Sequence, residues 1–428
     1  MNDMIFKRKL YDKLLVWKQQ TAGTKALLIE GARRIGKSTL VEEFAKNEYR
    51  SYLMIDFNKV SDSVISAFNN YMNDLDTFFL ILSSEYGVRL YPKESIIIFD
   101  EIQQFPKARQ AIKYLVADGR FDYIETGSLI SIKENVNDIT IPSEERTLLM
   151  YPMDFEEFAW AMNEEPLMAY IRQCFDKKVP LEQGIHAKAM LLFRQYMIVG
   201  GMPKSLSAYL ENNRNFEMAD MEKRDILTLY RNDIKKIKSG YRSSVLSIFD
   251  QIPAFLSRSE RRVVMNRIEK GASFPKYHDT FFWLSDSMIA NECFNCSDPN
   301  VGLSLNEDRT YVKCYMGDTG LLISHTFDEN EISDGELYRE ILLGKLSVNE
   351  GMFYENVIAQ MLVAAGHKLY FYTRYNQEKH RNDMEIDFIL SNHSKLRYKI
   401  FPIEVKSNDK YSIRSLTRFN ESFRQRTW

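Results

Sequence analysis

The stretch KALLIEGARRIGKST, residues 25–39, decides how the first part of the chain folds. Its first six residues form a short apolar run that ends at a glycine, which indicates a buried strand. Helix-forming residues follow, so a strand enters the loop and a helix leaves it. The spacing of Gly31, Gly36, Lys37 and Ser38 fits the phosphate-binding pattern G-x-x-x-x-G-K-[ST].

This loop predicts a site for ATP and Mg²⁺. Its glycines let the backbone curl so that N–H groups point at phosphate oxygens, and the dipole of the following helix favours negative charge. We expect Lys37 to bridge the β- and γ-phosphates and the Ser38 hydroxyl to bind Mg²⁺. A glycine-rich turn with a chance lysine is the alternative, and the flanking strand and helix argue against it.

Polar residues at the ends of two later strands extend the predicted site. In SIIIFDEIQ, Asp100 and Glu101 follow a buried strand, where ligands of parallel sheets bind. Asp100 is expected to hold Mg²⁺ through water and Glu101 to activate the attacking water; solvated strand-end carboxylates are the alternative. In TGS, the hydroxyls of Thr126 and Ser128 are either γ-phosphate sensors or part of a simple turn. The predicted nucleotide-binding residues are Gly31, Ala32, Arg33, Arg34, Ile35, Gly36, Lys37, Ser38, Thr39, Asp100 and Ser128.

The first part of the chain alternates strand-like and helix-like segments. The apolar, strand-like runs are residues 25–30, 51–57, 95–100, 122–127 and 147–152. Near-continuous apolar strands that alternate with helices predict the α/β class, with a parallel sheet covered by helices on both faces.

Length and composition limit the alternatives. A chain of 428 residues predicts two to four domains, and 45% hydrophobic with 27% charged residues is typical of a globular protein. A formal net charge of -2 means that any nucleic-acid surface is a local patch. The charged N-terminus, the lack of long apolar runs and the four cysteines predict a reduced cytoplasmic location with no membrane partner.

The rest of the chain divides into further segments. Residues 154–250 read as helices; short helices and two alternating strands follow to residue 324, an order that suits a winged-helix module. Residues 328–340 are polar and acidic and suggest a linker. The last segment opens with a helix and continues with the strands FYTRY, EIDFIL and IFPIEVK.

Taken in order, the motifs resemble the prokaryotic AAA-type ATPases whose C-terminal half is a domain of unknown function. The resemblance rests on GARRIGKST (31–39), FDEIQ (99–103), TGS (126–128), ERTLLMYPMDFEEF (145–158), YMIVGGMP (196–203), YMGDTGLL (315–322), FYENVIAQ (353–360), EIDFIL (385–390) and PIEVKS (402–407). It therefore extends over nearly the whole chain.

The resemblance implies four domains. They are an AAA-like ATP-binding domain with strand order 5-1-4-3-2 (1–153), a helical lid and connector (154–245), a winged-helix-like domain (246–327) and a domain similar to PD-(D/E)xK nucleases (341–428). Nuclease-like domains usually add a strand after the helix in which this sequence reaches Trp428, so we expect the last domain to be truncated.

Relatives usually carry Gly-Arg before the strand that precedes the F-E-E-F segment. Arg146 keeps the arginine, whereas Glu145 replaces the glycine. The resemblance implies that Arg146 is catalytic, either as a γ-phosphate sensor or as a finger that reaches a neighbour's γ-phosphate through self-association.

A second constellation lies near the C-terminus, where Glu355, Asp387, Glu404 and Lys406 match the nuclease-like motif. Alternate residues of a strand share one face, so Glu404 and Lys406 should lie together. If EIDFIL pairs beside them, Asp387 and Glu404 can bind Mg²⁺, Lys406 can activate water and Glu355 can complete the ligand set. A solvated strand face, or a structural partner such as Arg381, is the alternative.

Two weaker patterns remain. Cys293, Cys296, Cys314 and His278 suggest either a zinc site or, as the spacing favours, packed thiols. The basic stretch 257–270 suggests a helix that tracks DNA phosphates, a solvated helix or one that contacts another domain.

Two functions follow from these patterns. In the first, the nucleotide state of a Mg²⁺-dependent ATPase controls a nuclease-like effector that acts on DNA. In the second, the protein is a nucleotide-dependent switch or scaffold that binds nucleic acid or a protein partner without cleaving it.

Overall fold

The computed structural model of the chain describes residues 4–128, 143–237, 240–258, 261–263, 268, 274–300, 302–328, 335–345, 350–376, 378, 381–392, 399–407 and 411–427. The chain separates into two compact units, Met1–Met153 and Asp154–Trp428, which we call the first and the second unit.

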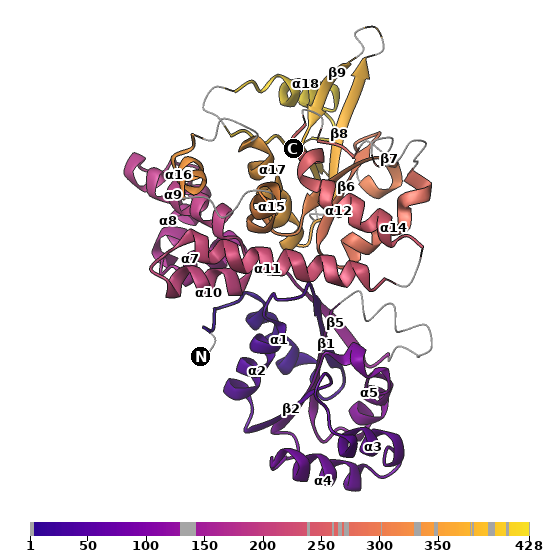
Figure 1. Ribbon diagram of the computed structural model, residues 1–428. Helices are drawn as coiled ribbons and strands as arrows, with labels where there is room; N and C mark the ends of the chain where they lie inside the picture. Colours follow the sequence, from indigo (N-terminus) through magenta and orange to yellow (C-terminus); the bar gives the residue numbers. More distant parts are fainter. Residues whose placement is uncertain are drawn as a thin grey trace. The chain divides into compact units, whose positions relative to one another are not determined.

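The first unit is built on a five-stranded sheet in which all pairings are parallel (Figure 1). Its strands are β1 (Ala26–Gly31), β2 (Ser51–Asp56), β3 (Ser95–Asp100), β4 (Asp122–Gly127) and β5 (Glu145–Met150). Their order across the sheet is β2-β3-β4-β1-β5, the order that the resemblance implied. The α/β class with a parallel sheet is confirmed.

Helices cover both faces of this sheet. They are α1 (Leu10–Gln20), α2 (Lys37–Glu48), α3 (Asp62–Asn70), α4 (Leu75–Tyr86) and α5 (Pro106–Asp118), with a short 3₁₀ turn, η1 (Ile102–Gln104). The helices α3, α4 and α5 share one apolar core with Leu28 of β1 and Phe99 of β3. Because side chains alternate along a strand, Leu27 and Ile29 face the other side, where α2 packs on the sheet.

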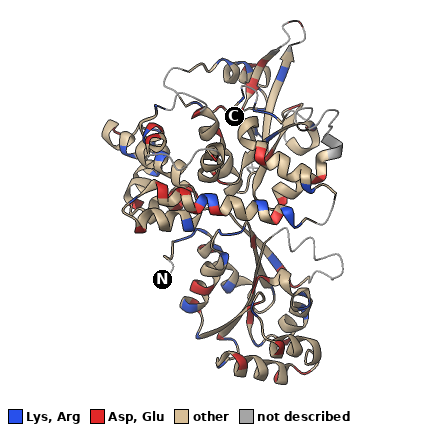
Figure 2. Ribbon diagram, viewed as in Figure 1, with Lys and Arg blue, Asp and Glu red and all other residues tan. Residues whose placement is uncertain are grey.

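The helices of the second unit both precede and follow its strands, and those up to Asp286 come before its first strand. They are α7 (Phe155–Ala161), α8 (Glu165–Lys177), α9 (Gln183–Val199), α10 (Pro203–Glu211), α11 (Phe216–Lys235), α12 (Arg242–Leu256), α14 (Phe274–Asp286), α15 (Thr319–Thr326), α16 (Glu336–Leu343), α17 (Glu350–Ala364) and α18 (Arg414–Ser422). The long helix α11 contacts α9, α10, α12 and α15, and basic and acidic residues are interspersed along it (Figure 2). None of the helices in the described part of the chain is long and apolar enough to cross a membrane.

Two sheets complete the second unit. The strands β6 (Ala290–Cys296), β7 (Glu307–Met316), β8 (Leu369–Asn376) and β9 (Arg381–Ile386) have the order β7-β6-β8-β9, and β10 (Phe388–Asn392) pairs with β11 (Lys399–Ile403). A short 3₁₀ turn, η3 (Leu303–Asn306), precedes β7, and β6 and β7 form the expected antiparallel pair. Since β6 also pairs in parallel with β8, strands from regions 246–327 and 341–428 share one sheet. The division into four domains stays a prediction.

The expected linker over residues 328–340 is wrong in its last part. The helix α16 begins at Glu336, and its Tyr338 and Ile341 are buried. The apolar residues of this helix are spaced so that one face packs on the protein, which outweighs the acidic character of the segment. Residues 329–334 lie outside the described part of the chain.

Motifs far apart in the sequence meet in the core of the second unit. Asp318 of YMGDTGLL is buried and caps α15 by accepting the Leu321 N–H at 2.9 Å. The same carboxylate accepts the Gly201 N–H of YMIVGGMP at 2.6 Å. The chain after α9 is thus fastened to the start of α15.

The helix α17, which carries FYENVIAQ, joins the same network. Gln360 accepts hydrogen bonds from the Thr319 N–H at 2.8 Å and the Thr319 hydroxyl at 2.9 Å. Asn356 accepts the Met316 N–H at 2.8 Å and donates to the Thr319 hydroxyl at 2.9 Å. Because these groups are buried, their hydrogen bonds replace water and fix α15 against α17.

The glycines in these motifs allow the backbones at Gly200 and Gly320 to approach each other closely. We therefore expect a larger residue at Gly320 to lower the free energy of unfolding. A Cβ on Gly320 would lie 2.6 Å from the Gly200 Cα, so Gly320→Ala should destabilise the protein by about 1–3 kcal/mol. At Gly184, in the first turn of α9, an added Cβ meets nothing within 4 Å. Gly184→Ala should therefore be neutral or stabilise by up to about 1 kcal/mol. Urea unfolding followed by circular dichroism compares the two variants. Equal stability of Gly320→Ala and Gly184→Ala would contradict the close approach.

A candidate nucleotide-binding site at the glycine loop

The glycine loop connects β1 to α2 at the carboxyl edge of the parallel sheet. A Cβ on Gly31 would lie 2.4 Å from the Met150 carbonyl oxygen, so only glycine fits there. Arg34 and Gly36 have φ angles of 66° and 88°, which turn the loop back before α2 begins at Lys37. The first N–H groups of this 12-residue helix lack partners within the helix and suit an anion.

Lys37 is folded back onto the loop. Its Nζ donates to the carbonyl oxygens of Gly31 at 3.0 Å and Ala32 at 2.8 Å. Burial lowers the pKa of Lys37 to about 8, although the carboxylates of Glu101 and Asp100 act in the opposite direction. A buried ammonium bonded to neutral carbonyls is placed to gain from the negative charge of a phosphate.

Ser38 and Asp100 meet at the ends of α2 and β3. The Ser38 hydroxyl donates to Asp100 Oδ1 at 2.8 Å, and the Thr126 hydroxyl donates to the same oxygen. Burial raises the pKa of Asp100, and the two hydroxyls act against that shift. A hydroxyl and a carboxylate at this distance are the oxygen ligands that Mg²⁺ prefers, so the residues fit the predicted ion.

Glu101 follows β3 directly. Its φ of 55° is unusual for a residue with a side chain. Its carboxylate accepts a hydrogen bond from Gln103 Nε2, and its N–H lies 3.4 Å from the Thr126 hydroxyl. Ser128 is buried just beyond the end of β4, at the same edge of the sheet.

Arg8, which the sequence reasoning missed, forms a hydrogen bond with the backbone of the glycine loop. Its guanidinium donates to the Ile35 carbonyl at 2.9 Å and to the Tyr151 carbonyl at 2.6 Å. It therefore connects the glycine loop to the chain that follows β5. A lone arginine before the first helix carries no motif, so only the fold could identify it.

The unusual Glu145 has a partner. Arg109 of α5 forms bidentate hydrogen bonds with the Glu145 carboxylate, at 2.9 and 2.7 Å, and both side chains are buried. Glu125 of β4 lies beside this pair, and burial together with the neighbouring Glu145 raises its pKa well above the ordinary value. The acidic Glu145, where the resemblance implied glycine, is thus compensated inside the protein.

Arg146 lies away from the glycine loop of its own chain. It pairs with Leu27 at the start of β1, whereas Gly31 pairs with Met150. Four residues of strand span about 13 Å, and the Arg146 side chain is exposed. The structure does not bring Arg146 to this site, and its action on a neighbouring subunit stays a prediction.

The C-terminal constellation is partly assembled. β10 pairs with β11 so that Phe388 faces Ile403, and Asp387 accepts the Val405 N–H at 2.8 Å. The predicted strand EIDFIL is interrupted at Asp387, because the chain before it pairs with β8 and the chain after it pairs with β11.

Glu404 and Lys406 follow the end of β11 rather than lie within it, which corrects the expected strand. They still share one side, because Lys406 Nζ donates to Glu404 Oε1 at 2.5 Å. The rival partner Arg381 precedes this segment in β9, and its side chain is outside the described part.

Glu355 is paired with two cations, of which the sequence reasoning missed Lys313. It is fully buried in α17, with Lys313 of β7 at 3.2 Å and an ion pair to Arg261. Tyr315 donates to the same carboxylate. Among the described residues, no group of three or more His, Cys, Asp or Glu side chains is arranged to hold a metal ion.

The weaker patterns have a structural explanation where they are described. All four cysteines are buried free thiols, and burial raises the pKa of Cys296 to about 11. The basic stretch 257–270 lies largely outside the described residues, and its Arg261 pairs with Glu355 of α17.

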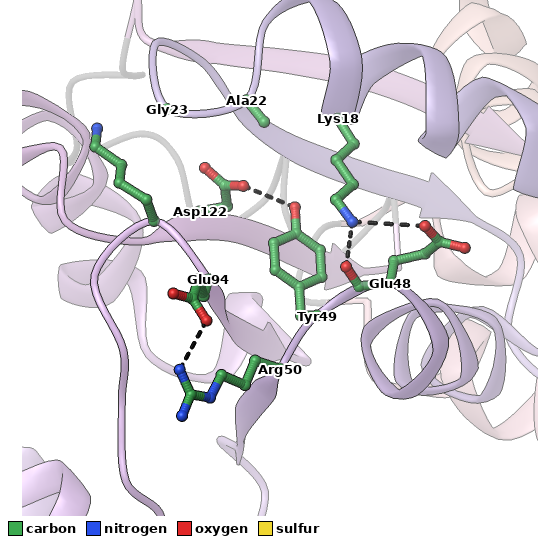
Figure 3. Close-up of a pocket in the computed structure, with 9 residues that line it drawn as sticks. Lys18, Ala22, Gly23, Glu48, Tyr49, Arg50, Glu94 and Asp122 are labelled. Atoms are coloured by element: carbon green, nitrogen blue, oxygen red, sulfur yellow. Dashed lines mark hydrogen bonds and ion pairs between the residues drawn. The ribbon is translucent and has the colours of Figure 1, made fainter.

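A pocket of about 470 Å³ lies at the other edge of the first sheet (Figure 3). Asp122 and Arg50, which line it, lie at or just before the first residues of β4 and β2, whereas the glycine loop follows the end of β1. Its carboxylates already have partners: Tyr49 donates to Asp122 at 2.7 Å, and Arg50 pairs with Glu94 at 3.0 Å. This pocket is separate from the candidate site.

The comparison with known protein families agrees with the fold and the glycine loop of the first unit. Residues 23–159 match a family model described as an AAA domain. Residues 190–331 and 350–427 match two models that are each described as a domain of unknown function. No curated protein sequence matches the chain.

Solved structures are similar only distantly. Cdc6p from Pyrobaculum aerophilum is 11% identical, with a TM-score of 0.31 over 81% of this chain and 97% of its own. The ORC1 protein of Aeropyrum pernix in complex with DNA is 10% identical, with a TM-score of 0.29 over 76% of this chain and 94% of its own. AMPPCP-bound DnaA from Aquifex aeolicus is 12% identical, with a TM-score of 0.28 over 66% and 90%.

The sheet order and the glycine loop define a P-loop nucleoside triphosphatase. With the family match, the chain carries an AAA-type P-loop ATPase domain at residues 23–159 and binds ATP.

The pKa of Lys37 gives ATP binding a pH dependence. Because this pKa is lowered from 10.5 to about 8, the ammonium loses its proton as pH rises through 8. The dissociation constant should rise by about fivefold from pH 8 to 9, as the charged fraction falls. Lys37→Arg stays charged and should show no such step, whatever its affinity. Calorimetric titration at several pH values checks this, and a flat wild-type profile would contradict it.

Proposed function

We propose that the first unit hydrolyses ATP with Mg²⁺ at the carboxyl edge of its sheet. The hydrogen bond between Ser38 and Asp100 carries the proposal, because it joins the helix after the glycine loop to the acid at the end of β3. Those two side chains would hold Mg²⁺, which neutralises phosphate charge when bound.

The other residues divide the remaining tasks. Backbone N–H groups of residues 31–39 bind the phosphates, and Lys37 leaves its loop carbonyls to contact the β- and γ-phosphates. Thr126 holds Asp100 in place. Glu101 orients the attacking water and accepts its proton, while Ser128 is placed for the γ-phosphate side.

Two substitutions separate binding from turnover. Lys37→Ala should abolish ATP binding, because it removes the ammonium group that is proposed to contact the β- and γ-phosphates. Glu101→Gln should keep ATP affinity and lower turnover by at least about a hundredfold, since the amide cannot accept the proton. Fluorescence titration and phosphate release measure the two steps. Wild-type ATP affinity in Lys37→Ala would refute the assignment.

We further propose that nucleotide state controls the second unit as an effector. Two candidates remain for that effector: a nuclease-like domain acting on DNA, or a module that binds nucleic acid or protein without cleavage. The positions of Asp387 and Glu404 at adjoining strand ends support the first. The second candidate, binding without cleavage, is favoured. Two of the predicted metal ligands are already paired with lysines, Glu404 with Lys406 and Glu355 with Lys313.

DNA binding would use the winged-helix-like region. The helices α12 and α14 pack beside the β6–β7 pair, which is the expected arrangement of such a module. Basic residues are not gathered along α11 but alternate with acidic ones (Figure 2), so this helix does not supply a phosphate-binding face. Self-association and a cytoplasmic location stay predictions from the sequence.

A DNA assay separates the two effector candidates. We expect the wild-type protein with ATP and Mn²⁺ to shift duplex DNA in a gel without cutting it. The variant Asp387→Asn should then leave DNA binding unchanged. Metal-dependent cleavage that is lost in Asp387→Asn would instead establish the nuclease.

A further inference from the structure

Lys313 lies at the centre of the C-terminal carboxylates. Its side chain is fully buried in β7, the strand opposite β6. Its Nζ lies 3.2 Å from Glu355 Oε1, 3.3 Å from Glu385 Oε1 and 3.9 Å from Asp387 Oδ1. These three acids come from α17, β9 and the turn between β9 and β10.

The surroundings of Lys313 offer its ammonium group several partners. An ammonium removed from water needs opposite charges, and the three carboxylates provide them. Its Nζ also lies 5.0 Å from the centre of the Phe371 ring, whose face attracts cations. Arg261 adds a second positive charge at Glu355.

The same geometry does not fit a divalent cation. Mg²⁺ requires oxygen ligands at about 2.1 Å, whereas the acids stand at ion-pair distance from a nitrogen. The position where the acids converge is taken by Nζ. Glu404, the other predicted ligand, pairs with Lys406.

We propose that Lys313 is a built-in cation that replaces the metal ion of a nuclease-like site. The carboxylates of α17 and β9 then serve to fix β7 in place, and the wild-type site does not take up Mg²⁺ or Mn²⁺. Removing the ammonium should leave an excess of negative charge and so create a divalent-cation site. This inference is independent of ATP hydrolysis.

The test uses the full chain in a Lys37→Ala background, which removes the ATP site from the measurement. Lys313→Ala and Lys313→Met should lower the melting temperature, and Mn²⁺ at millimolar concentration should restore part of the loss. Adding Asp387→Asn to either variant should abolish this rescue by Mn²⁺. The parent with Lys313 should show neither a Mn²⁺-dependent shift in melting temperature nor Mn²⁺ binding by calorimetry.

Two results would overturn the proposal. One is Mn²⁺ binding by the parent protein that disappears in Asp387→Asn, since Lys313 would then not exclude the metal. The other is a folded Lys313 variant that gains no Mn²⁺ binding. If neither Lys313 variant folds, calorimetry on the parent and its Asp387→Asn form decides alone. A failure of the ATPase assignment would appear instead in ATP titrations of wild type and leaves this experiment unaffected.

Discussion

Gly31 and Met150 approach so closely that no side chain fits between them, and the nucleotide site depends on this contact. It exists because β1 lies between β4 and β5, which places the loop after β1 beside the ends of its neighbours. The register that pairs Phe99 with Glu125 then sets Asp100 next to Thr126, one residue further along. The grouping of Ser38, Asp100 and Thr126 is thus a consequence of sheet order, since no short segment contains all three.

A second constraint recurs in both units: several charged groups removed from water have partners inside the protein. In the first unit, Arg109 balances Glu145, and both side chains are buried. In the second, Asp318 satisfies the backbone N–H groups of Gly201 and Leu321. An unmatched buried charge costs far more than the pair contributes, so these partners must be retained together. YMIVGGMP and YMGDTGLL, two of the motifs that carry the resemblance, meet in this packing.

The sequence predicted what local patterns and a known fold determine. Apolar runs placed the five strands of the first sheet to within about two residues, and the glycine loop located the site. Three cations were missed, namely Arg8, Arg109 and Lys313. Each contacts groups at least 27 residues away in sequence, and each belongs to no motif, so only the folded chain shows its role. The break at Asp387 was missed for a related reason, because strand partners, not composition, decide where a strand ends.

These contacts also limit how a nucleotide signal can act on the second unit. Region 341–428 joins region 246–327 through the β6–β8 pairing and the buried pair of Lys313 with Glu355. Separating the two regions would break the β6–β8 strand ladder and the buried pair of Lys313 with Glu355. A ligand shifts a conformation only by its difference in affinity for the two states, and typical couplings are about 1–3 kcal/mol. Under the proposed control by nucleotide state, we expect the two regions of the second unit to move together rather than to separate.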